Sequence, residues 1–215
     1  MAQRMRACTA CHGQQGRAGP DGYYPRLAGK PAAYLYHQLL NFRDGRRHYG
    51  PMTRLVDTLS DAYLLDIAQH FASLQAPYSP PAVPASLPGA SVLARGQHLA
   101  LHGDAALRLP ACAQCHGSAL TGALPHVPGL LGLSSDYLLA QLGGWKIGQR
   151  RAHAPDCMAS VAQRLSDADA YAVVTWLSLQ PMPADPRPAP AMPGPASADM
   201  PDLACGAAPS PRGQP

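Results

Sequence analysis

Two copies of one short cysteine pattern constrain this 215-residue chain more than any other feature. One copy reads CTACHG and the other CAQCHG, so both contain C-x-x-C-H. On a helical turn, residues i, i+3 and i+4 share a face, so two thiols and an imidazole can meet one flat ligand from the same side. The pattern is typical of covalent haem attachment and predicts two haem c groups. The predicted attachment residues are Cys8, Cys11 and His12 in the first copy and Cys112, Cys115 and His116 in the second.

A zinc knuckle and a redox dithiol are the alternative interpretations of a single C-x-x-C motif. Structural zinc takes four ligands, which would require a second Cys or His pair close to each motif. Neither motif has such a pair nearby, and the whole pattern occurs twice. Haem attachment is therefore the favoured prediction.

Similar segments follow the two motifs at nearly the same distance, which indicates an internal repeat. YYPRLAGKPAAYLYHQLLNFRDGRR follows the first motif and HVPGLLGLSSDYLLAQLGGWKIGQRR follows the second. Later, PMTRLVDTLSDAYLLDIAQHFASLQ matches CMASVAQRLSDADAYAVVTWLSLQ. The repeat predicts two copies of one small haem domain. The aligned pairs include Pro25 with Pro128, Gly29 with Gly132, Tyr34 with Tyr137, Gln38 with Gln141 and Phe42 with Trp145.

Proline-rich segments mark the predicted boundaries. Residues 77–90 carry enough prolines to disfavour regular structure and to favour an extended linker. They separate a first domain, residues 1–76, from a second domain, residues 91–180. Residues 181–215 are rich in proline and poor in apolar periodicity, so this C-terminal tail is expected to lie on the surface or to be disordered.

Helical periodicity is the secondary-structure signal in both halves. The first predicted helix opens with Pro31 at its first position and ends near Gly45. Ser60 and Ser166 are predicted N-caps of the two LSD-containing helices. No convincing alternating strand is present, so the predicted fold is all-α, with each of two tandem domains wrapped around one covalent haem.

The composition limits what fills the interior and what the chain binds. Only 6% of the residues are aromatic and Phe occurs twice, so something besides aromatic side chains is expected inside. The aligned Tyr34 and Tyr137 are expected to be core aromatics. The 17 Lys and Arg against 13 Asp and Glu form no basic run, so no nucleic-acid partner is predicted. No apolar stretch is long enough for a membrane span, which indicates a soluble protein.

Haem chemistry depends on what occupies the sixth position of the iron, opposite the histidine. Met52 and Met158 occupy matched positions of the repeat, each shortly before an LSD helix. They are the predicted axial ligands. His48 and His153 lie close to these methionines and are the rival ligands, which would give a haem of lower potential.

Together the CxxCHG, YPRLAGK, YLYHQLLNFRDGRR, PM and LSDAYLLDIAQHFASLQ segments resemble the dihaem cytochromes c of the cytochrome c-four family. The resemblance covers about residues 7–180. It implies two class I cytochrome domains, each with a His/Met haem, that pass electrons in the periplasm between a respiratory complex or dehydrogenase and a terminal oxidase. It also implies that Pro25 and Pro128 present their carbonyls to the ring nitrogens of the haem histidines. Such an acceptor fixes the imidazole tautomer.

The predicted function follows from the ligation. If methionine closes both irons, neither has an open position for a substrate, so the protein is predicted to be a one-electron carrier and not an enzyme. Its partners would be redox proteins, and any membrane association would come through them. The alternatives are a dihaem peroxidase, with one displaceable ligand, and a cytochrome subunit docked permanently on a dehydrogenase.

Arginines follow the aligned helices of both domains, as Arg46, Arg47, Arg150 and Arg151. A guanidinium pairs well with a carboxylate, and Arg47 and Arg151 are the predicted partners of the haem propionates. The alternative is a solvated basic helix end, which the helix dipole favours in any case.

The first motif has little sequence before it. A plausible helix, SVLARGQHLALHG, precedes Cys112, whereas only MAQRMRA precedes Cys8. A class I cytochrome normally packs an N-terminal helix against its C-terminal one. Covalent haem attachment in bacteria occurs outside the cytoplasm, yet no secretion signal is present. The native protein is therefore expected to start earlier.

Two cysteines remain after haem attachment, Cys157 and Cys205. Neither has a counterpart in the first domain, and exposed thiols tend to pair in an oxidising compartment. A Cys157–Cys205 disulfide is predicted to hold the tail across the Met158 loop. Two unpaired thiols with a mobile tail are the alternative.

Overall fold

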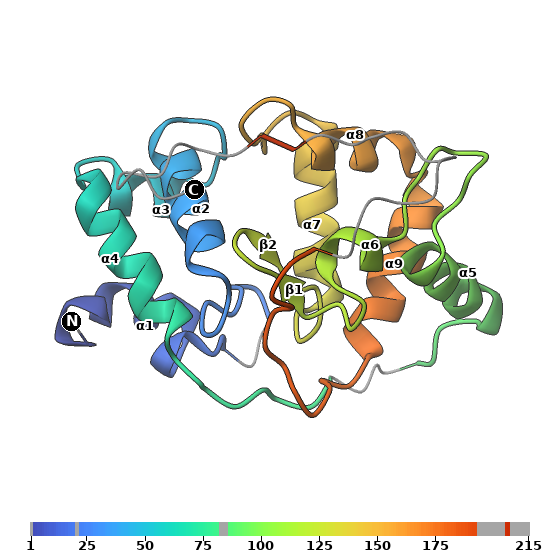
Figure 1. Ribbon diagram of the computed structural model, residues 1–215, viewed down its shortest axis with the longest axis horizontal. Coiled ribbons are helices and arrows are strands. Elements are labelled where there is room, and N and C mark those ends of the chain that lie inside the picture. The colour runs from blue at the N-terminus through green and yellow to red at the C-terminus, as the bar shows by residue number, and fades with distance from the viewer. Residues whose placement is uncertain (1, 20–21, 82–85, 193–204, 207–215) are drawn as a thin grey trace.

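The computed structural model describes residues 2–19, 22–81, 86–192 and 205–206 and is predominantly helical (Figure 1). Within these described residues, the first half carries two 3-10 turns and four helices, and the second half carries five helices and a two-stranded hairpin. No helix in the described part has the length and apolar character needed to cross a bilayer. The elements are η1 (Ala2–Met5), α1 (Arg6–His12), η2 (Gln14–Gly16), α2 (Ala32–Arg43), α3 (Gly50–Val56), α4 (Asp61–Ala72), α5 (Ala90–Leu101), α6 (Cys112–His116), β1 (Gly122–Ala123), β2 (Val127–Pro128), α7 (Ser135–Lys146), α8 (Cys157–Arg164) and α9 (Asp167–Leu179).

Local sequence signals explain where the long helices begin. The Ser60 hydroxyl accepts a hydrogen bond from the backbone N–H of Tyr63, and the Ser166 hydroxyl accepts one from that of Asp169. Both N-cap predictions are confirmed. Pro31 is the N-cap of α2 and not its first helical residue, so that helix begins one position later than predicted.

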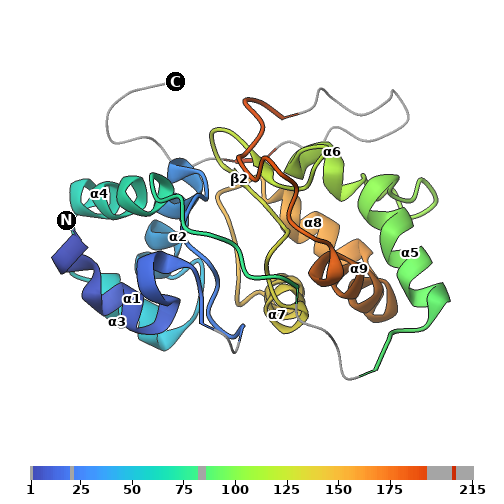
Figure 2. The same cartoon turned by 90° about the horizontal axis from the view of Figure 1, so that it is seen from below.

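Most of the buried apolar side chains fall into two clusters that share no residue. The first cluster lies between Met5 and Phe71, and the second lies between Leu99 and Leu177. Figure 2 shows the corresponding helices as two groups joined by an extended segment. We call these groups the first and second domains.

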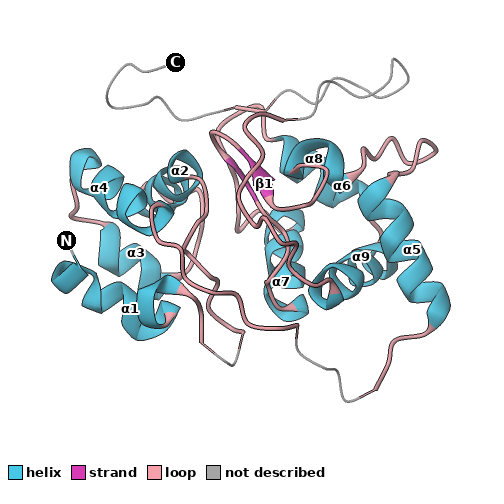
Figure 3. Cartoon of the chain, turned by 60° about the horizontal axis from the view of Figure 1, so that its bottom comes forward, coloured by secondary structure: helices cyan, strands magenta, loops and turns pink. Residues whose placement is uncertain are grey.

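The second domain is built on the packing of α5 against α9 (Figure 3). A Cβ atom at Gly96 of α5 would lie 2.2 Å from the carbonyl oxygen of Ala172 in α9, so the two backbones approach too closely for any side chain there. α9 also packs against α7. Because α9 is covered on two sides, it is apolar over most of its circumference.

A short antiparallel hairpin, β1–β2, was not predicted from the sequence. It pairs Gly122 with Pro128 and Ala123 with Val127. Strands of two residues carry no detectable alternation, and the hairpin leaves the all-α class unchanged. Its importance is positional, because it ends at the proline whose carbonyl faces the second histidine motif.

A hydrogen-bond network related by the repeat joins the two domains. The backbones pair antiparallel at Arg47 and Arg150, where His48 N–H donates to the Gln149 carbonyl at 2.9 Å and Arg151 N–H donates to the Arg46 carbonyl at 2.7 Å. The side chains repeat the exchange. Arg47 donates to Gln38 in its own domain and to Gln141 and Tyr137 in the other, and Arg150 donates to Gln141, Gln38 and Tyr34.

The two tyrosines expected in the cores therefore have a second role. Tyr34 packs partly against the first core, but its hydroxyl accepts from Arg150, and the Tyr137 hydroxyl accepts from Arg47 at 3.1 Å. Neither side chain is fully buried. A hydroxyl needs a hydrogen-bond partner when it is removed from water, and here the partner belongs to the other domain.

Arg26 fixes the start of the linker. The residue is 4% exposed, and its guanidinium donates to the carbonyls of Ala28, Ala76 and Pro77 while it stacks 3.7 Å from the centre of the Tyr78 ring. The chain after α4 is thus extended but held in place up to Tyr78. Residues 82–85 of the predicted linker lie outside the described residues.

The α5–α9 contact predicts a matched pair of glycine substitutions. Gly96→Ala should lower the free energy of unfolding by about 1–3 kcal/mol, because the new methyl group forces two helices apart. Gly143→Ala in α7, where a Cβ would meet nothing within 4 Å, should be neutral or stabilising by up to about 1 kcal/mol. Denaturant unfolding of the two holoproteins, followed by circular dichroism, measures both values. Equal stability of the two variants would contradict the proposed helix contact.

Candidate haem sites

The first candidate site is a cavity of about 810 Å³ between α1 and α3. The side chains of Cys8, Cys11 and His12 all face it from α1. His12 is 6% exposed, and its Nδ1 lies 2.8 Å from the carbonyl oxygen of Pro25. Because a carbonyl only accepts, Nδ1 carries the proton and Nε2 keeps a free lone pair. Burial lowers the pKa of His12, which favours the neutral imidazole that a metal requires.

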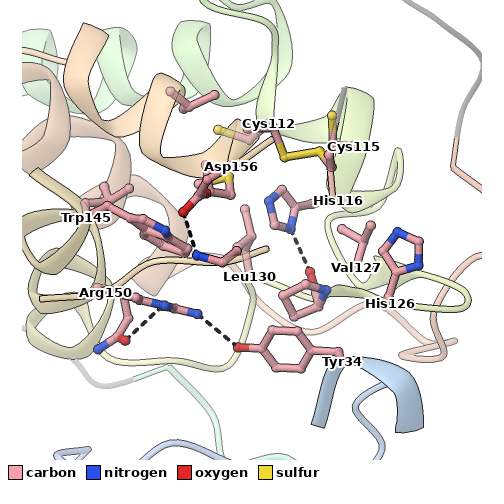
Figure 4. Close-up of a pocket in the computed structure, with 18 of the residues that line it drawn as sticks. Tyr34, Cys112, Cys115, His116, His126, Val127, Leu130, Trp145, Arg150 and Asp156 are labelled. Atoms are coloured by element: carbon pink, nitrogen blue, oxygen red, sulfur yellow. Dashed lines mark hydrogen bonds between the residues drawn. A yellow bond between two sulfur atoms is a disulfide. The ribbon is translucent and has the colours of Figure 1, made fainter. Parts of the chain in front are cut away.

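The second candidate site repeats this arrangement in a smaller cavity of about 240 Å³ (Figure 4). Cys112, Cys115 and His116 line it from α6. The Nδ1 atom of His116 lies 2.7 Å from the carbonyl oxygen of Pro128, and burial lowers the pKa of this histidine too. The same tautomer therefore results in both domains.

The four motif cysteines are not disulfide-bonded. Burial raises the pKa of Cys8 and of Cys115, and it raises that of Cys112 to about 12. A redox dithiol needs the opposite shift, toward the thiolate. Within the described residues, no three His, Cys, Asp or Glu side chains form a group that could hold a metal ion, so the zinc alternative lacks a ligand set.

The methionines predicted as ligands line the same two cavities as the motif histidines, from different helices. Met52 belongs to α3 and lines the first cavity, and Met158 belongs to α8 and lines the second. In Figure 1, α3 and α8 lie toward the top of their domains, while α1 and α6 lie below them. The rival ligands His48 and His153 line the same two cavities, so the cavity linings alone do not choose between the pairs.

Arg47 and Arg150, and not Arg151, occupy equivalent places at the cavities. Arg47 lies 4.5 Å from the centre of the Phe42 ring, and Arg150 lies 3.8 Å from that of Trp145, the aligned aromatic. Arg150 is 7% exposed and lines both cavities. Arg151 is exposed, and its guanidinium donates to the Gly45 carbonyl at 3.5 Å. The sequence predicted Arg151 instead of Arg150 because each domain has two arginines close together at this position.

Two buried polar atoms of the second cavity have no partner. The indole Nε1 of Trp145 and the Nε2 of His153 make no hydrogen bond to any residue that the structure describes, although both atoms are removed from water. A buried donor without an acceptor is unfavourable, and a carboxylate beside Trp145 and Arg150 would satisfy it. An apolar cavity with an imidazole, two thiols and such a polar edge fits a haem with its propionates.

Lys30 lies between the two sites and was not identified from the sequence. It lines both cavities, and its Nζ donates to the carbonyl of Gly129 at 3.3 Å. Burial lowers the pKa of Lys30 to about 8. The aligned residue in the second domain is Leu133, so the repeat gave no signal for this position.

The described tail covers part of the second site. Ala189 exchanges backbone hydrogen bonds with Gly122 and Leu124, and the Thr121 hydroxyl donates to the Arg187 carbonyl. The tail up to residue 192 therefore lies on the surface, which is one of the two alternatives predicted from the sequence. Residues 193–204 and 207–215 lie outside the described residues.

The structure also contains a disulfide between Cys157 and Cys205, with an S–S distance of 1.96 Å and a Cα–Cα distance of 5.0 Å. Cys157 is the first residue of α8 and directly precedes Met158. The backbone N–H of Gly206 donates to the Pro155 carbonyl at 2.8 Å. The chain around Cys205 is thus held against the loop that leads into α8.

Comparisons with known proteins identify the family of the chain. The cytochrome c family profile matches residues 94–181. A thiosulfate dehydrogenase electron acceptor from Thiomonas intermedia is 39% identical over 82% of this chain and 79% of its own length. A cytochrome c4 from Pseudomonas aeruginosa is 33% identical over 79% of this chain and 82% of its own. The crystal structure of reduced recombinant cytochrome c4 from Pseudomonas stutzeri superimposes with a TM-score of 0.70 at 29% identity, covering 82% of this chain and 95% of that one.

The thiosulfate dehydrogenase electron acceptor and the cytochrome c4 each match this chain over both of its repeats. The two cavities also fit the cofactor that the motifs predict. The chain therefore belongs to the family of dihaem class I cytochromes c that includes cytochrome c4 and the thiosulfate dehydrogenase electron acceptors, and it carries two covalently bound haem c groups.

Proposed function

We propose that this protein carries single electrons from a periplasmic dehydrogenase toward a terminal oxidase, with His12 and Met52 on one iron and His116 and Met158 on the other. One observation carries the proposal: in both domains a histidine and a methionine, matched by the repeat, line one cavity from two different helices. An iron closed on both faces has no position for a substrate, so the protein has no catalytic activity of its own.

The surrounding residues support this ligation. The carbonyls of Pro25 and Pro128 hold the two imidazoles in one tautomer and orientation, which keeps Nε2 available to the iron. Arg47 and Arg150 are suited to the propionates, because each presents a guanidinium at a cavity edge and stacks on an aromatic ring. The haem itself supplies the reversible change of iron charge.

A thiosulfate-oxidising dehydrogenase is the donor that the relatives favour. The relative from Thiomonas intermedia, named as the electron acceptor of such an enzyme, is 39% identical, against 33% for the cytochrome c4 from Pseudomonas aeruginosa. Oxidative coupling of two thiosulfate ions releases two electrons, and two haems can accept both. The Cys157–Cys205 disulfide and covalent haem attachment both suit the periplasm.

Removal of either methionine should affect only its own haem. Met52→Ala and Met158→Ala should each leave one iron low-spin and convert the other to a high-spin form that binds added cyanide, because one thioether ligand is lost. Visible absorption and electron paramagnetic resonance of the ferric proteins measure this. Met182→Ala is the matched control, since Met182 packs against the second core without lining its cavity.

Two results would contradict this ligation. A high-spin iron in the unmodified ferric protein at neutral pH would instead favour the dihaem peroxidase. A Met158→Ala protein that keeps two low-spin irons, and loses one only when His153 is also replaced, would assign His153 to the second haem.

The proposed donor can be tested directly. A purified thiosulfate dehydrogenase with thiosulfate should reduce the oxidised holoprotein by two electron equivalents per molecule, because each haem accepts one. The same mixture without the enzyme measures direct reduction by thiosulfate. Reduction of the Thiomonas intermedia acceptor but not of this protein would reject the donor and leave the carrier function standing.

A further inference from the structure

The two cavities differ in what covers their edges. At the first cavity, Cys11 is exposed, and two large apolar side chains on the rim remain open to solvent, Tyr23 at 61% and Leu55 at 46% exposure. These three residues come from different segments: Cys11 from α1, Tyr23 from the loop before α2 and Leu55 from α3. The edge of the first haem site is therefore framed by exposed apolar surface.

Arginines outnumber acidic side chains at this open edge, where the exposed Asp136 also lines the cavity. Residues 2–19 contain Arg4, Arg6 and Arg17 and no Asp or Glu, and all three arginines are exposed. Arg4 itself lines the cavity. On the opposite wall, the exposed Arg54 is the neighbour of Leu55, and Asp57 follows at the end of α3. Arginines thus flank the apolar rim on both sides.

The second cavity differs in being partly covered by the tail, although Met192 of the tail is itself 46% exposed. Its lining includes Met192, Cys205 and Gly206, all of which belong to the tail. The backbone bonds of Ala189 and the disulfide hold the described tail there. Cys115 is half-buried, whereas its counterpart Cys11 at the first cavity is exposed. The second cavity has a volume of about 240 Å³ and the first a volume of about 810 Å³.

We propose that redox partners dock on one face only, the open edge of the first cavity, and that this face accepts a protein whose own surface is acidic around an apolar centre. The inference rests on the proposed carrier function and specifies its partner. Each encounter transfers one electron: the partner loses it, the iron of the first domain gains it, and the second domain exchanges electrons with partners through the first. No proton or atom is transferred.

The charges and the apolar rim together select this partner. Apolar side chains at the centre exclude water from the contact, and a charged rim steers the encounter and sets its orientation. Opposite charge raises the association rate by about 10- to 1,000-fold at low salt. One face for both donor and acceptor requires that the two bind in turn and not together.

Charge reversal at the open edge tests the proposal. The probe is a plant-type [2Fe–2S] ferredoxin, a small acidic one-electron donor, mixed with the oxidised holoprotein in a stopped-flow instrument. The double substitution Arg4→Glu with Arg54→Glu should slow haem reduction at least about tenfold at low ionic strength and remove most of its salt dependence. Arg187→Glu, at an arginine of the tail with an 80% exposed side chain, is the matched control and should change the rate less than about twofold.

Each other outcome overturns the proposal. Equal slowing by the control would place the docking face on the second domain or spread it over both. An unchanged rate in the double variant would remove the arginines from the contact. If the wild type self-associates in sedimentation and the double variant does not, the face binds a second copy of the chain.

The carrier function is tested separately by equilibrium titration with dithionite. Uptake of one electron by each haem, in the wild type and in every variant, leaves that function intact whatever the ferredoxin rates show. Failure of that uptake in the wild type would reject the carrier function itself.

Discussion

Each domain is built around a space that its own side chains do not fill. Aromatic residues make up 6% of the chain, and the buried clusters surround the cavities instead of closing them. In the first domain, core residues such as Phe42, Val56 and Phe71 also line the cavity. An empty apolar cavity of this size is costly, so the haem is part of the core as well as the redox centre. Helix positions, the histidine tautomer and the domain interface all depend on that arrangement.

The domain interface connects the two sites through a few side chains. Arg150 lines both cavities and donates hydrogen bonds to Gln38 and Gln141, one from each domain. Arg47 and Arg150 are like charges at one contact, and burial lowers the pKa of Arg150, as Arg47 does to a smaller extent. Buried cations are stable when anions neutralise them. Propionates from the two haems are suited to that role, so the interface and the cofactors would stabilise each other.

Much of this organisation is visible in the sequence because it is repeated. The paired motifs predict the cofactor, the aligned segments predict the helices, and local capping predicts where two of them begin, at Ser60 and Ser166. A residue that acts alone leaves no such trace. Arg26 and Lys30 act through carbonyls distant in the sequence, and nothing near them in the sequence indicates burial. The sequence pointed to Arg151 as a propionate partner and not to Arg150. Only the register of the antiparallel contact, which pairs Arg150 with Arg47, shows which of the two side chains faces the cavity.

The features that break the repeat also divide the work between the domains. Within the described residues, a hairpin, a disulfide and a tail segment are found at the second cavity and not at the first. Covering a haem excludes water and lowers the local dielectric, which shifts its potential and lengthens the route to a partner. The first domain keeps the edge of its cavity open and carries the exposed Arg4 and Arg54 beside it. Two copies of one sequence pattern thus acquire different roles, because the residues outside the repeat shield one haem and leave the other accessible.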